Sequence, residues 1–252
     1  MIEKYYNGVI EQVAGGIGNV EHNSILVRYS NDFSIWDLES VNHYKDQTDI
    51  FFTCHEFSYN KIAEAYAPYL GLIRQMFHKY CSGTLEEFME ECDVYKLQRP
   101  VFESYFENGF CERTEQILID EVEYEQERMR NSIVTMLQKL SEIRPVVIVL
   151  NRFQLASKST MQLTNSLLQV KNKNIGIVLG VNDVQSIPEF AHEEWDAICE
   201  SMDDRNMVYH IGNAGSNMEP DVMDYYSDYE SDDGYRKLNN LVYFLDCDQA
   251  DH

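Results

Sequence analysis

Polar residues that could bind a phosphate or a metal ion directly follow three apolar runs of the sequence. They are Asn31, Asp32 and Ser34 after the first run, Asn151 and Arg152 after the second, and Asn182 after the third. Asn182 stands at the carboxyl end of a predicted strand, where open α/β sheets bind their ligands. Asp32, together with Asp37 and Asp183, could supply carboxylate oxygens to a metal ion.

The loop after the first run lacks the groups that hold a triphosphate. The segment Ser30–Ser34 contains no glycine that would let backbone amides close around a phosphate. No lysine occurs between Lys4 and Lys45, although a phosphate loop needs one to reach the β and γ phosphates. We therefore expect Asp32 or Ser34 to act as the cap of the following helix.

Short apolar runs predict the strands that must position these loops. They cover residues 24–29, 49–54, 146–150, 175–181 and 207–211. Pro145 prevents a helix from running into the third run, and helical periodicity over 157–170 separates it from the fourth. A strand, a crossover helix and a second strand form a right-handed βαβ unit. The sequence thus predicts a three-layer α/β fold with a mostly parallel sheet of about five strands.

Helical spacing of apolar residues predicts the remaining elements. The helices are expected over 1–13, 35–44, 69–80, 84–95, 114–143 and 190–202. Thr84 followed by Glu87 has the pattern of a capping box. The glycine cluster in 14–19 is interpreted as a helix end and turn, and 99–113 as an irregular segment. The stretch 114–143, which has no Gly or Pro, is expected to form a long helix on one face of the sheet.

Composition excludes several classes of protein. The 252 residues carry 20 Lys and Arg against 43 Asp and Glu, a net charge of −23, so nucleic acids and acidic partners are disfavoured. The six cysteines show no zinc-site spacing and are expected to be buried free thiols. They are Cys54, Cys81, Cys92, Cys111, Cys199 and Cys247. Neither a signal peptide nor a membrane span is recognised, so we expect a cytoplasmic protein without membrane contact.

Changes in composition predict the domain organisation. Residues 1–215 are expected to form one α/β domain whose strands and helices lie between 24 and 211. Residues 216–234, rich in acids, predict a mobile loop or linker. Residues 235–252 regain an apolar pattern and predict an edge strand or the start of a further segment. We expect the chain to be part of a longer protein.

One segment carries a family resemblance. The sequence RPVVIVLNRFQLASKSTMQLTNSLL (144–168) resembles the second nucleotide-site segment of the signal-transduction ATPases with numerous domains, P-loop regulators of the AAA-like class. The segment YAPYLGLIRQMF (66–77) is similar to a further part of that family. Family members have two acids after the strand, where this chain has Asn151 and Arg152. They also have an Asp after the alanine, where this chain has Ser157.

The resemblance implies a degenerate P-loop NTPase-like domain, as found in multidomain bacterial signalling regulators. It assigns the place of the phosphate loop to the segment with Asn31, Asp32 and Ser34, and it assigns a γ-phosphate sensor to Asn182. Phosphoryl transfer depends on charge neutralisation and positioning, so loss of the lysine and of both acids removes magnesium together with its ligands. The resemblance therefore implies a pseudo-ATPase with no cofactor and no catalytic residue. Its partners would be other domains of the polypeptide or other proteins.

Two alternative functions remain open from the sequence. A working ATP-binding or ATP-hydrolysing signalling ATPase could hold ATP and magnesium through Asp32, Asp37 or Asp183. A plain interaction module could instead use the acidic segment Glu219–Asp233 to engage a basic partner. Arg152 could also attract a phosphate or an acidic side chain, although a loop arginine is more commonly solvated.

Overall fold

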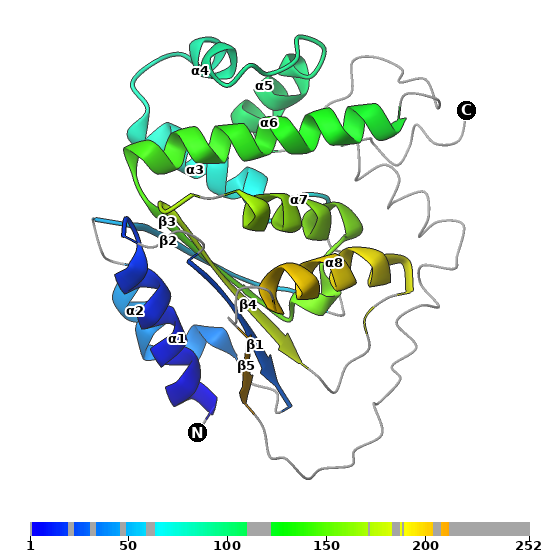
Figure 1. Cartoon of the computed structure of the whole chain (residues 1–252). Helices are drawn as coiled ribbons and strands as arrows, with labels where there is room; N and C mark the ends of the chain where they lie inside the picture. The colour runs from blue at the N-terminus through cyan, green and yellow to red at the C-terminus, as the bar shows by residue number, and fades with distance from the viewer. Residues whose placement is uncertain are drawn as a thin grey trace. The chain divides into compact units, whose positions relative to one another are not determined.

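The computed structural model describes most of the chain between residues 2 and 211. The described residues are 2–19, 23–30, 34–45, 49–58, 64–109, 122–170, 172–182, 187, 189–203 and 208–211. They form two compact units, one within 1–63 and 141–224 and the other within 64–140 (Figure 1). The second unit is therefore an insertion in the sequence of the first. The predicted acidic loop, the predicted last strand and the boundary at 215 lie outside the described residues and stay predictions.

A parallel sheet forms the centre of the first unit. Its strands are β1 (Ser24–Tyr29), β2 (Phe51–Glu56), β3 (Val146–Asn151), β4 (Ile175–Asn182) and β5 (Val208–Ile211). They lie in the order β2-β3-β4-β1-β5, and every neighbouring pair is parallel. Every residue of β3 and β4 is buried, which explains their continuous apolar sequence. The predicted α/β class with a parallel sheet is thus confirmed.

Helices cover both faces of this sheet (Figure 1). The helix α1 (Ile2–Gly16), the 3-10 turn η1 (Ile35–Asp37) and α2 (Glu39–Lys45) pack on one face. The other face is covered by η3, α7, η4 and α8. Their bounds are η3 (Phe153–Leu155), α7 (Lys158–Gln169), η4 (Glu189–Ala191) and α8 (His192–Asp203).

The core on the α1 face is built from alternate strand residues and the apolar stripe of α1. Its members from the helix are Tyr6, Val9, Ile10 and Val13, and those from the sheet include Ile25, Val27, Tyr29, Val147, Val149 and Val178. The helix approaches β4 closely at Gly176, where an added Cβ would lie 2.6 Å from Val13 Cγ1. Glycine at that strand position therefore sets the distance between α1 and the sheet.

The second unit is helical. It contains α3 (Tyr69–Tyr80), α4 (Leu85–Glu91), α5 (Arg99–Asn108) and most of α6 (Val122–Ile143). The predicted capping box is confirmed, because Glu87 N donates to Thr84 Oγ1 at 3.2 Å and Thr84 N donates to Glu87 Oε2 at 2.9 Å. Residues 110–121, the first part of the predicted long helix, lie outside the described residues.

The prediction of an irregular segment over 99–113 was wrong for residues 99–108, and residues 110–113 lie outside the described residues. Residues 99–108 form α5, which has Pro100 in its first turn and ends at Gly109 with φ 80°. Proline is favoured in a first turn because the amide it lacks would have no helical partner there. Phe102 and Phe106 are buried and lie one helical turn apart, so the aromatic residues mark an amphipathic helix.

Several other predicted elements differ in their bounds, and α1, predicted to end at Val13, runs to Gly16. The helix expected over 35–44 is broken at Leu38, a buried residue with extended backbone (ψ 133°), into η1 and α2. The strand expected over 49–54 is Phe51–Glu56, because its register with β3 continues to the end of that strand. The helix expected over 84–95 ends at Glu91. Among the described residues, no helix is both long enough and apolar enough to cross a membrane.

Candidate functional site

The topology brings the predicted site positions that follow β1, β3 and β4 to one edge of the sheet. Because β4 lies between β1 and β3, the carboxyl ends of all three strands are neighbours. Tyr29 is paired in register with Asn182 across β1 and β4. Asn151 ends the adjacent strand, β3, and Ser34 follows in the loop after β1. Asn31, Asp32 and Asp183 lie outside the described residues, so their part in this edge stays a prediction.

A hydrogen bond at this edge joins β1 to β3, the two strands on either side of β4. Tyr29 Oη donates to Asn151 Oδ1 at 2.8 Å, and both side chains are fully buried. The bond passes over β4 at Gly180. A Cβ on that residue would lie 2.5 Å from Asn151 Oδ1 and 2.3 Å from Tyr6 Oη. Only glycine leaves room for this contact, because real Cβ atoms do not approach other heavy atoms so closely.

Tyr6 of α1 completes the packing above Gly180. Its ring meets the ring of Tyr29 edge to face, with centroids 6.5 Å apart. Burial raises the pKa of Tyr6 well above its ordinary value, and the nearby Tyr29, Cys54 and Glu56 raise it further. Tyr6 is therefore a neutral phenol at physiological pH. Two tyrosine rings occupy the space over the carboxyl end of β4.

The side chain of Asn151 is buried and forms a hydrogen bond within the protein. Its side chain is 0% exposed, and its Oδ1 accepts the hydrogen bond from Tyr29. Its Nδ2 is buried and has no hydrogen-bond partner among the described residues. The oxygen that would have to face a metal ion is thus used in a protein contact.

Arg152 forms an ion pair instead of meeting solvent. Its guanidinium lies 3.4 Å from Glu56 Oε1, and both side chains are largely buried. The backbone of Arg152 has φ 53°, a left-handed conformation that turns the chain from β3 into η3. Glu56 ends β2 in register with Asn151, which places the carboxylate beside the turn. Of the interpretations open from the sequence, an acidic side-chain partner is the one observed.

Asn182 and Ser34 make local contacts. The backbone amide of Asn182 donates to Gln154 Oε1 at 3.4 Å, and both residues are buried. Ser34 is the N-cap of η1, and its Oγ accepts from Trp36 N at 3.3 Å. The predicted capping role of Ser34 is therefore confirmed, while Asp37 lies in the first turn of the same short helix.

Ser157 caps the start of α7. Ser157 Oγ accepts from Thr160 N at 3.3 Å and donates to Thr160 Oγ1 at 2.9 Å. The next residue, Lys158, lies 3.1 Å from Glu194 on α8. These contacts hold the helix end and attach it to its neighbour, which is a structural role.

No group of three or more His, Cys, Asp or Glu among the described residues is placed to hold a metal ion. Four cysteines are described, and all are free thiols. Only Cys92 is buried, so the expectation of burial was wrong for the three that are partly exposed, Cys54, Cys81 and Cys199. Burial raises the pKa of Cys54 and of Cys92 to about 12, which keeps both protonated and weakly nucleophilic.

No protein-family model matches the sequence, and a search of curated proteins finds no match either. Function must therefore be inferred from the residues at the sheet edge. Sequence analysis missed Tyr6, Tyr29 and Glu56 because an aromatic or acidic residue in or beside a predicted helix or strand has no local signature of a shared site. Gly180 was the one available signal, since an isolated glycine inside a buried strand indicates a close approach.

Proposed function

We propose that this chain is a P-loop NTPase-like regulatory domain that does not hydrolyse ATP and acts through contacts with proteins or other domains. The observation that supports it most is the buried hydrogen bond between Tyr29 and Asn151. It occupies the sheet edge to which the family resemblance assigns the phosphates and the metal-binding acids. A protein that used this edge for a nucleotide would have to break that bond and expose both side chains.

The charges at the edge also disfavour phosphoryl transfer. That reaction requires cations and preorganised donors at the transferred phosphoryl group. Here Asn151 is a neutral amide, and the one arginine of the turn, Arg152, is paired with Glu56 at 3.4 Å. Loss of one preorganised electrostatic group costs about 100- to 1,000-fold in kcat, and this edge departs from the family pattern at both acid positions. Hydrolysis at a useful rate is not expected.

The same features fit a regulatory scaffold. A parallel sheet with both faces covered and its carboxyl edge filled by Tyr6 and Tyr29 holds its shape without a ligand. Such a unit can present fixed surfaces to partners, and its conformation does not depend on nucleotide. The net charge of −23 favours basic partners over nucleic acids or anionic membranes.

Calorimetric titration with ATP tests the proposal. The full chain is titrated with ATP in the presence of MgCl2 and, as the control, in the presence of EDTA. A thermal-shift measurement runs in parallel, because a ligand at about 100 times its Kd would stabilise the folded chain by about 2.7 kcal/mol.

We expect no binding heat at micromolar concentrations, no thermal shift and no phosphate release. Magnesium-dependent binding in the micromolar range would overturn the proposal and favour the alternative of an active ATPase with atypical ligands.

A further inference from the structure

Three exposed apolar side chains lie in the turn before α5 and in the first turn of α6 in the helical unit. Tyr95 is 42% exposed, Leu97 59% and Tyr124 64%. The guanidinium of Arg128 lies over the Tyr95 ring, 4.6 Å from its centroid. Tyr124 is four residues before Arg128 on α6 and so shares its side of the helix. Leu97 belongs to the turn closed by the bond from Gln98 N to Tyr95 O. We call these four residues the Tyr95–Tyr124 surface.

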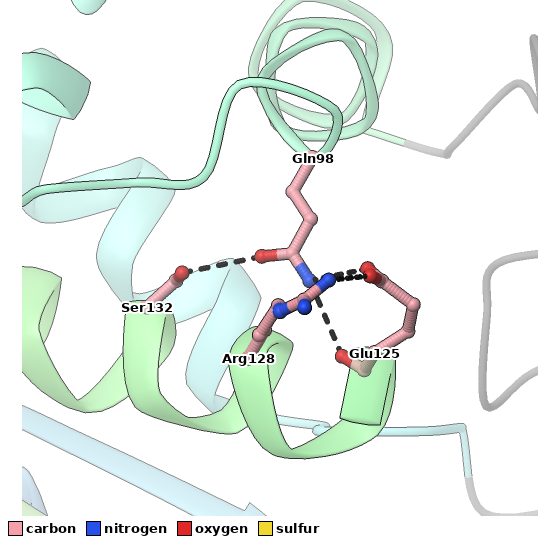
Figure 2. A network of polar contacts seen from close by, with 4 residues as sticks. All are labelled: Gln98, Glu125, Arg128 and Ser132. Atoms are coloured by element: carbon pink, nitrogen blue, oxygen red, sulfur yellow. Dashed lines mark hydrogen bonds and ion pairs between the residues drawn. The ribbon is translucent and has the colours of Figure 1, made fainter. Parts of the chain in front are cut away.

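A buried polar network fixes the base of this surface (Figure 2). Gln98 Nε2, just before α5, donates to Glu125 O and to Glu125 Oε2, each at 3.2 Å. Ser132 Oγ donates to Gln98 Oε1 at 3.3 Å. All three side chains belong to buried residues, so the start of α5 is held against α6. A rigid surface loses little conformational entropy when it binds, which favours recognition.

The charge on this surface is negative. Arg128 forms an ion pair with Glu125, so its own charge is largely compensated (Figure 2). Glu123 and Glu127, both exposed, stand on either side of Tyr124 in the sequence of α6. Among the described residues of this region, Asp93 is a third exposed acid and Lys96 is an exposed lysine. A second copy of a chain with net charge −23, or its own acidic segment, would be repelled.

We propose that the Tyr95–Tyr124 surface binds a basic protein segment that presents arginine or lysine beside a large apolar side chain. The inference rests on the proposed regulatory function and names the chemistry of the partner. Tyrosine faces attract cations, as Arg128 already shows on Tyr95, and tyrosine is enriched among the residues that dominate binding energy. Leu97 supplies an apolar contact. The exposed acids steer a basic partner to the surface and add complementarity at the rim.

A displayed library of random peptides tests this proposal. The full chain is used as bait, and enriched peptides are synthesised and measured by fluorescence anisotropy. We expect enriched peptides to be basic and to contain large apolar residues. Their affinity should fall by at least about tenfold in Tyr124→Ala and in Leu97→Ala, since exposed anchors of this kind dominate such interfaces.

The matched control is Tyr5→Ala, which removes a tyrosine that is 58% exposed on α1 of the other unit and leaves the net charge unchanged. Peptide affinity should not change in this variant, and circular dichroism verifies that all variants are folded. Three results would each overturn the inference: no enriched peptide, enriched peptides without basic residues, or equal affinity in Tyr124→Ala, Leu97→Ala and the unsubstituted chain. Peptide affinity and ATP binding are measured separately. A surface that binds no basic peptide would overturn this inference, whereas magnesium-dependent ATP binding would overturn the proposed function.

Discussion

Substitution of Tyr29 by phenylalanine should destabilise the first unit, although it removes a single oxygen atom. The hydroxyl of Tyr29 donates to Asn151 Oδ1 at 2.8 Å inside a fully buried site. Without this donor, the amide of Asn151 has neither its oxygen nor its nitrogen satisfied by a described residue. A buried polar group left without a partner costs about 1–3 kcal/mol. We expect the free energy of unfolding of Tyr29→Phe to fall by about that amount.

A double-mutant cycle separates this effect from loss of packing. Replacement of both partners by apolar groups of similar shape can be nearly neutral, since no polar group then remains buried without a bond. The double variant Asn151→Leu, Tyr29→Phe should therefore lose less free energy of unfolding than the two single variants lose in sum. The coupling energy should lie between about 0.5 and 3 kcal/mol, the range of residues in direct contact.

Urea unfolding followed by circular dichroism provides the measurement. Midpoints and slopes are fitted for the unsubstituted chain, both single variants and the double variant. For a domain of this size, each 1 kcal/mol also lowers Tm by about 2–4 °C, which gives a second readout. A Tyr29→Phe variant within about 0.5 kcal/mol of the unsubstituted chain, or a cycle with no coupling, would contradict the filled edge and with it the strongest support for a non-hydrolysing domain.

Two further predictions concern glycine and pH. Gly180→Ala places a methyl group 2.3 Å from Tyr6 Oη and should lower the free energy of unfolding by about 1–3 kcal/mol, as measured by urea unfolding. Gly8→Ala on α1 is the control, because a Cβ there has no atom within 4 Å and should not lower stability. Equal effects of the two would contradict the close packing. The hydrogen bonds from Thr84 lower the pKa of Glu87, so its stabilising effect is present above the ordinary glutamate pKa and is lost as pH falls through the lowered pKa. The difference in Tm between Glu87→Gln and the unsubstituted chain should therefore shrink in acid, and a constant difference would contradict a stabilising contribution from the charged carboxylate.

Much of the sheet could be predicted from the sequence because nearly all residues of β1, β3 and β4 are buried. β1 has the predicted bounds, and β3 and β4 each extend the predicted run by one polar residue, Asn151 and Asn182. These last residues continue the ladder because neighbouring strands pair with them. Burial of the whole strand makes the apolar pattern continuous and easy to recognise.

The errors have a common physical cause, which is that tertiary contacts decide local structure. Leu38 is fully buried and interrupts the helix predicted over 35–44, although its local sequence would allow a helix to continue. α5 was missed because its buried face consists of two phenylalanines among charged residues, a weak pattern for periodicity. Neither feature is visible without the partner that the side chain packs against.

The sequence predicted which residues lie at the candidate site but did not predict which residues they contact. The resemblance drew attention to Asn151 and Asn182, and strand order places both at one edge. The partner of Asn151 is Tyr29, which is 122 residues away in the sequence. Their hydrogen bond requires a glycine at position 180, because a Cβ there would lie too close to Asn151. Such a contact follows from the spatial order of the strands, which local patterns do not contain.

The strand order also determines when each strand of the sheet can pair during synthesis of the chain. β1 is made first, yet its two neighbours in the sheet are β4 and β5, and the helical unit is made in between. A nascent chain that ends before residue 175 therefore contains the apolar strand β1 but neither of the strands that pair with it. Closure of a long loop delays such pairing. The first strand of the sheet to be synthesised is therefore among the last to be paired, and its apolar residues lack their strand partners until then.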